Sequence, residues 1–141
     1  MATILLIEPD QVPRMLLAEA LEDRGHCVRA VPRAEYAVAG LREEPPDAVV
    51  IRLGAWSDNG LGALERGLES WPATPVIAYG LPPRRTWPAL GRLGASVIGG
   101  AEPDRLERAI RRAVRTSEHG FGLASQAGVG EGLVDLTAMT V

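Results

Sequence analysis

The sequence contains no lysine, and all fifteen of its basic residues are arginine. This absence excludes any mechanism that needs a lysine ammonium group. Cysteine occurs once, at Cys27, which excludes an internal disulfide and a cysteine-based metal cluster. Since Cys27 lies in a short apolar run that predicts a strand, we expect it to be a small buried side chain rather than a reactive thiol.

Aromatic residues make up only 4% of the chain, so aliphatic side chains and alanine must fill most of the core. No apolar run approaches the ~20 residues that span a bilayer, and no basic segment precedes an apolar one as in a signal peptide. We therefore expect a soluble cytoplasmic protein without a membrane partner. The net charge of −3 gives no case for a nucleic-acid partner.

Short apolar runs alternate with amphipathic segments five times along the first 116 residues. Strands are predicted at 4–7, 27–31, 48–51, 75–79 and 95–98. Helices are predicted between Asp10 and Gly25 and at 34–42, 61–68, 86–93 and 102–116. This alternation predicts a parallel sheet with helices on both faces, in which ligands bind beyond the carboxyl ends of the strands.

The residues just after the predicted strands are therefore the candidates for function. They are Glu8, Pro9, Asp10, Arg52, Gly80 and residues 99–101. The acidic pair Glu8 and Asp10 raises the question of a bound cation. For Asp10 we favour the role of a helix cap, because aspartate is preferred at that position.

Six segments, taken in order and with their spacing, resemble a known family. They are ILLIEPD, LEDRGHCVRAV, PPDAVVIRL, the Asn59–Gly60 turn, TPVIAYG and LGASVI. Together they resemble the response-regulator receiver domain, the phospho-accepting module of two-component signal transduction and phosphorelays. The resemblance implies a flavodoxin-like three-layer sandwich, with a five-stranded parallel sheet in the order 2-1-3-4-5 and five helices on both faces. The matches extend over residues 3–116, and we expect a receiver-like domain at 1–119 followed by a glycine-rich tail at 120–141.

The chemistry of that family needs an aspartate nucleophile, paired carboxylates for a divalent cation, a hydroxyl residue and a lysine. In this chain the nucleophile position falls on Arg52 and the carboxylate pair on Glu8 and Pro9. The hydroxyl position falls on Gly80, and the lysine position falls near residues 100–101. We therefore expect a degenerate pseudo-receiver that is not an enzyme and holds no metal or cofactor. An ion pair between Glu8 and Arg52 is expected, with the guanidinium replacing the charge of the metal.

Two alternatives remain open at this pocket. Arg52 could bind a small anionic ligand with help from Arg84 or Arg85, because guanidinium groups suit phosphate and carboxylate geometry. Such a chain would be a ligand sensor. Alternatively, Asp58 could serve as a displaced nucleophile in a noncanonical phosphorelay.

The last predicted helix carries arginines at spacings of three, four and three, which places them on one face. They are Arg105, Arg108, Arg112 and Arg115. This face is a candidate interaction surface, although it could simply be solvated. Trp56 and Trp87 either belong to a binding surface or cover the vacated pocket. We therefore expect signalling by contact with a protein partner or a second copy in a homodimer.

Overall fold

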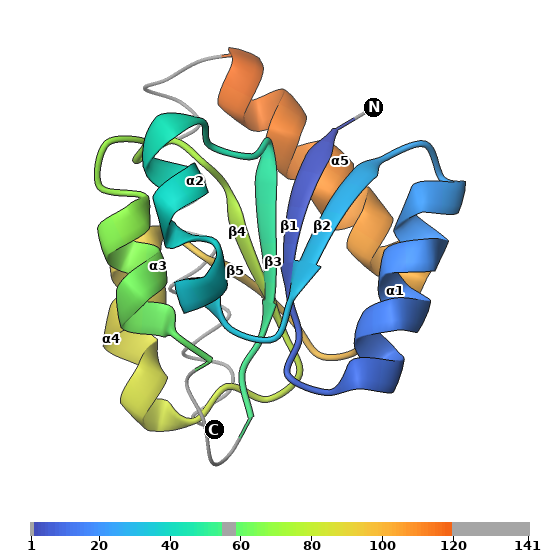
Figure 1. Cartoon of the computed structure of the whole chain (residues 1–141), viewed down its shortest axis with the longest axis horizontal. Coiled ribbons are helices and arrows are strands. Elements are labelled where there is room, and N and C mark those ends of the chain that lie inside the picture. The colour runs from blue at the N-terminus through green and yellow to red at the C-terminus, as the bar shows by residue number, and fades with distance from the viewer. Residues whose placement is uncertain (1, 55–58, 120–141) are drawn as a thin grey trace.

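The computed structural model describes residues 2–54 and 59–119, with the side chains of residues 117–119 left out, and Figure 1 shows the order of its elements. The strands are β1 (Thr3–Ile7), β2 (Cys27–Val31), β3 (Ala48–Arg52), β4 (Val76–Tyr79) and β5 (Ser96–Ile98). The helices are α1 (Gln11–Asp23), α2 (Val38–Glu43), α3 (Leu61–Gly67), α4 (Trp87–Leu93) and α5 (Pro103–His119). Two short 3-10 helices, η1 (Ala34–Tyr36) and η2 (Arg84–Thr86), precede α2 and α4.

The five strands form one parallel sheet in the order β2-β1-β3-β4-β5, which confirms the predicted flavodoxin-like topology. The register brings the carboxyl ends of the central strands together. Ile7 lies opposite Ile51 on β3, and Arg52 lies opposite Tyr79 on β4. Residues that end or follow β1, β3 and β4 therefore meet at one edge of the sheet.

The helices cover the sheet in two layers, as Figure 1 shows. Leu17 and Leu21 of α1 and Leu106 and Ile110 of α5 pack on one face of the sheet. The other face is covered by α2, α3 and α4. Because β3 and β4 are buried on both faces, their sequences AVVIR and VIAY are almost continuously apolar.

The structure corrects two of the sequence-based expectations about the elements. The helix predicted over 34–42 is divided into η1 and α2, because Ala37 adopts φ −121°, outside the helical range. Cys27 is exposed rather than buried, because it begins β2, the strand at the edge of the sheet. No helix within the described part of the chain is long and apolar enough to cross a membrane.

The turn before α3 requires a glycine at Gly60. Its φ of +81° lies in the left-handed region, and an added Cβ would lie 2.6 Å from Oε1 of Glu35. The backbone nitrogen of Ala34 would be only 3.0 Å away. The Asn59–Gly60 turn thus lets the loop after β3 pack closely against η1 at the carboxyl edge of the sheet.

Candidate functional site

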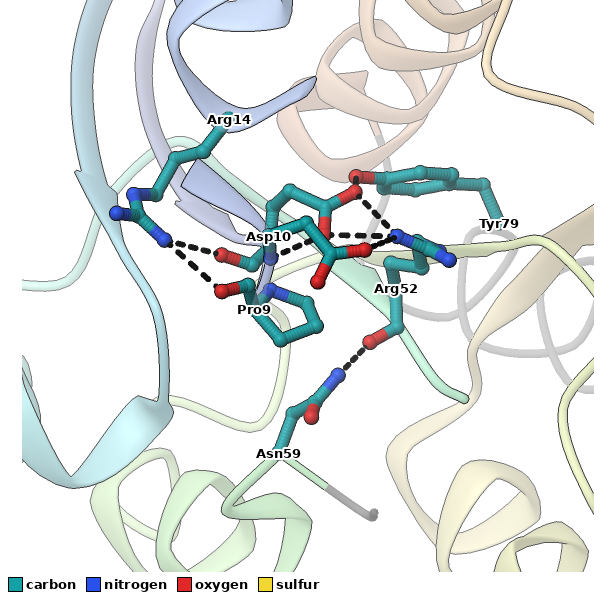
Figure 2. Close-up of polar contacts among 7 residues, drawn as sticks. Pro9, Asp10, Arg14, Arg52, Asn59 and Tyr79 are labelled. Carbon is teal, nitrogen blue, oxygen red and sulfur yellow. Dashed lines mark hydrogen bonds and ion pairs between the residues drawn. The ribbon is translucent and has the colours of Figure 1, made fainter. Parts of the chain in front are cut away.

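The carboxylate of Glu8, directly after β1, is the centre of the site. Only 1% of Glu8 is exposed, so its charge needs partners. The carboxylate accepts a hydrogen bond of 2.9 Å from the backbone N–H of Asp10 and one of 2.8 Å from the hydroxyl of Tyr79. Figure 2 shows Asp10, which follows β1, and Tyr79 of β4 on the same group of contacts, together with Arg52 of β3.

Arg52, the last residue of β3, supplies the positive charge. Its Nη1 lies 3.2 Å and 3.0 Å from the two carboxylate oxygens of Glu8 and 2.9 Å from Oδ2 of Asp10. The hydrogen bond to Asp10 and the charge of Glu8 outweigh burial and raise the pKa of Arg52 above its usual value. The predicted ion pair between Glu8 and Arg52 is thus present across the adjacent strands β1 and β3.

Asp10 occupies the N-cap position of α1, but its side chain forms no capping hydrogen bond. The predicted role as a cap is therefore wrong. Its carboxylate binds Arg52 instead, because a charged guanidinium is a stronger donor than a backbone N–H. Arg14 fixes the same turn by donating to the carbonyl oxygens of Glu8 and Pro9 at 2.9 Å and 3.2 Å.

Tyr79 at the end of β4 is a site residue that the sequence analysis missed. It is 1% exposed, and burial followed by the charge of Glu8 raises its pKa. The hydroxyl therefore stays protonated and serves as a donor to Glu8. The signal in the sequence was a tyrosine within an otherwise aliphatic strand, since a buried tyrosine hydroxyl needs a hydrogen-bond partner.

Two further residues fix the backbone around the site. The side-chain amide of Asn59 donates to the backbone carbonyl of Arg52 and so fixes the end of β3. Gly80 has φ +92°, a conformation that side chains with a Cβ rarely adopt, and its N–H bonds to the carbonyl of Ile98 at 3.0 Å. A hydroxyl residue at position 80 would thus need a different backbone conformation.

The site does not offer a good set of metal ligands. No cluster of three or more histidine, cysteine, aspartate or glutamate side chains suited to a metal occurs among the described residues. Pro9 supplies no side-chain ligand, and both oxygens of Glu8 accept hydrogen bonds from Arg52. Mg²⁺ needs several oxygen ligands in near-octahedral geometry.

The remaining candidate residues belong to η2, α4 and α5 or lie outside the described residues. Arg84 in η2 stacks over Trp87, with its guanidinium carbon 5.7 Å from the ring centroid, and Arg85 follows it. The ring of Trp87 is partly buried against the core, and its Nε1–H donates to the carbonyl of Pro82 at 3.0 Å. Asp58 and Trp56 lie outside the described residues. The predicted arginine stripe Arg105, Arg108, Arg112 and Arg115 is exposed on α5.

Known proteins resemble this chain in sequence and in fold. The virulence transcriptional regulatory protein PhoP of Salmonella typhimurium is 30% identical over 128 residues, covering 89% of this chain and 56% of PhoP. The receiver domain of NtrX from Brucella abortus is 28% identical, with a TM-score of 0.66 over 80% of this chain and 98% of that domain. A CheY-like receiver domain protein from Methanospirillum hungatei shares the fold, with a TM-score of 0.71 at 18% identity.

The chain is therefore similar in sequence to PhoP and to the receiver domain of NtrX, and similar in fold to receiver domains. No protein-family model matches the sequence. The receiver-like chain spans about half the length of the curated relatives that it matches.

Proposed function

We propose that this receiver-like chain is a pseudo-receiver, which signals by protein–protein contact without aspartyl phosphorylation and without enzymatic activity. The observation that supports this proposal is the guanidinium of Arg52 at the end of β3, bound to Glu8 and Asp10. A cation at this place carries no carboxylate to attack a phosphoryl group. The guanidinium of Arg52 also forms hydrogen bonds with the carboxylate of Glu8, which a divalent cation would need as a ligand.

Local charge favours this proposal over the alternative of a sensor for a small anion. The ion-paired cluster contains one guanidinium, Arg52, and two carboxylates, Glu8 and Asp10, so the formal charge of these three groups is −1. A phosphate or carboxylate that approached Arg52 would meet these two negative groups at hydrogen-bonding distance from the same nitrogen. Arg84, proposed as a helper, lies against Trp87.

The proposal is tested by incubating the purified chain with acetyl phosphate and Mg²⁺ and measuring its intact mass. We expect no gain of a phosphoryl group, while a receiver domain that keeps its aspartate gains one in the same reaction. Phosphorylation that is lost in Asp58→Asn would refute the proposal and establish the phosphorelay alternative. Amide NMR titration with anionic nucleotides should leave Glu8, Arg52 and Gly80 unshifted, and a cluster of shifts there would favour the ligand sensor.

A further inference from the structure

Helix α1 presents two kinds of side chain on the face that it turns away from the sheet. In its first half, Val12, Met15 and Leu16 are 65%, 61% and 61% exposed, although all three are large and apolar. In its second half, three exposed acidic residues continue the same face at helical spacing, namely Glu19, Glu22 and Asp23. Half of the large hydrophobic residues that are exposed in the described part of the chain lie on this one helix.

Helix α5 carries the opposite charge on its outer face. Leu106 and Ile110 are fully buried against the sheet, and the other side of the helix is lined by the arginine stripe Arg105, Arg108, Arg112 and Arg115. The acidic residues near the start of the helix are bound elsewhere, Asp104 by Arg24 and Glu107 by His26 and Arg111. Within residues 2–54 and 59–116, no arginine of the stripe forms an ion pair.

These two faces belong to the same side of the molecule. Helices α1 and α5 pack against each other in one layer, and Arg24, just after α1, bridges to Asp104 at 2.6 Å. The outer face of α1 extends over ~17 Å and the arginine stripe over ~15 Å, at 1.5 Å per helical residue. Within the described residues, no ion pair joins the acidic residues of α1 to the arginine stripe.

We propose that the outer face of α1 and the arginine stripe of α5 form a self-association surface for a second copy of this chain. A two-fold axis across this side sets α1 of each copy against α5 of the other. Each arginine stripe then meets the carboxylates of Glu19, Glu22 and Asp23. The aliphatic stems of the arginines can cover Val12, Met15 and Leu16 while their charged ends stay hydrated or paired.

A second copy fits this surface better than a nucleic acid does. Without the four arginines of the stripe, the net charge of −3 becomes −7 for the rest of the chain. The acidic half of α1 lies in the same layer as the stripe and would repel a phosphate backbone. Binding of nucleic acid would also leave the three exposed apolar residues of α1 uncovered. The inference goes beyond the proposed function and holds whether or not Arg52 prevents phosphorylation.

The test is sedimentation velocity of the full 141-residue chain over a series of concentrations at about 0.05 M and about 0.5 M NaCl, which change the screening length severalfold. We expect a reversible dimer that weakens at high salt. Two charge-reversed variants, R108E/R112E and E19R/E22R, should each raise the Kd at least about tenfold, because like charges then face each other. A mixture of the two variants should restore the dimer, since each reversed face meets an opposite charge on the other chain.

The control is R42E/R66E, which makes the same change of charge on exposed arginines of α2 and α3, in the layer on the opposite face of the sheet. It should leave the Kd unchanged, and circular dichroism should show all variants folded. A wild-type chain that stays monomeric, a dimer that both reversals leave intact, or a mixture that fails to restore association would each overturn the inference. A shift of the monomer by duplex DNA, lost in R108E/R112E, would instead identify a nucleic-acid surface.

Discussion

The substitution Arg52→Gln should destabilise the protein mainly through the carboxylate that Arg52 leaves behind. Glu8 is 1% exposed, and Arg52 is its only cationic partner among the described ion pairs. After the substitution Glu8 keeps the N–H of Asp10 and the hydroxyl of Tyr79 as donors. It then carries a buried negative charge with no compensating positive charge.

The expected loss is about 2 kcal/mol. Removing one partner of a fully buried ion pair costs ~3–5 kcal/mol. The side chain of Arg52 is 36% exposed, so water can replace part of what the guanidinium supplied. For a chain of this size, the loss corresponds to a fall in Tm of roughly 4–8 °C.

Urea unfolding followed by circular dichroism measures this loss, with Glu8→Gln and the double variant completing a thermodynamic cycle. Because the double variant removes both charges, it should lose at least about 1 kcal/mol less than the two single variants together. The matched control Arg66→Gln, at an exposed position on α3, should stay within about 0.5 kcal/mol of the wild type. A loss as small as this for Arg52→Gln would refute the view that Arg52 compensates the charge of Glu8.

Three further predictions test the charges of the site and of α5. Arg52→Asp adds a third carboxylate beside Glu8 and Asp10, so Mg²⁺ at about ten times its Kd should raise the unfolding free energy of this variant by ~1.4 kcal/mol. Thermal melts in Mg²⁺ and in NaCl of equal ionic strength measure this gain. A variant that gains no stability specific to Mg²⁺ would contradict the prediction. Tyr79→Phe should cost about 1 kcal/mol. Burial and the charge of Glu8 raise the pKa of Tyr79, so the contribution of its hydroxyl to the free energy of unfolding should hold below about pH 10 and decline as the pH rises further. Because Tyr79 stays protonated in the folded protein, the tyrosinate absorbance of the folded wild type at alkaline pH should match that of Tyr79→Phe. Burial alone would raise the pKa of Glu107, but hydrogen bonds from His26 and Arg111 lower it below 4.5. The wild type should therefore be more stable than Glu107→Gln at about pH 6, and this difference should fade as the pH falls through the pKa of Glu107 in the folded state. A difference that grows in acid would show that the pKa of Glu107 is not lowered.

The alternation of strands and helices could be predicted because the strands are short apolar runs separated by glycine and proline, whereas the strand order came from the resemblance to receiver domains. The errors arise where tertiary position decides the outcome. Cys27 is exposed because β2 lies at the edge of the sheet, and the sequence CVRAV alone does not indicate an edge position. Similarly, Leu16 lies one position from the buried Leu17, and only the rotation of α1 against the sheet decides which of the two is exposed.

The sequence predicted the contact of the site that follows from strand order, and it missed the contacts made by polar side chains to which another role had been assigned. Glu8 and Arg52 end adjacent strands, so the order 2-1-3-4-5 was enough to bring them together. Asp10 was assigned a local role because capping preferences are local, but its partner Arg52 lies 42 residues away. Tyr79 was counted as an apolar strand residue, although its hydroxyl is the third donor to Glu8.

The same contacts explain why a change of state at this pocket would be hard to achieve. A phosphorylated aspartate gains and loses charge, whereas the pKa of Arg52 is raised, so its charge is constant at physiological pH. Glu8 joins the ends of β1, β3 and β4 through bonds to Arg52 and Tyr79. Separating these strand ends would expose a buried carboxylate and leave a buried hydroxyl without its partner. Regulation of the proposed pseudo-receiver would then act on its outer surfaces. The proposed self-association surface of α1 and α5 is one whose occupancy would change with salt and protein concentration.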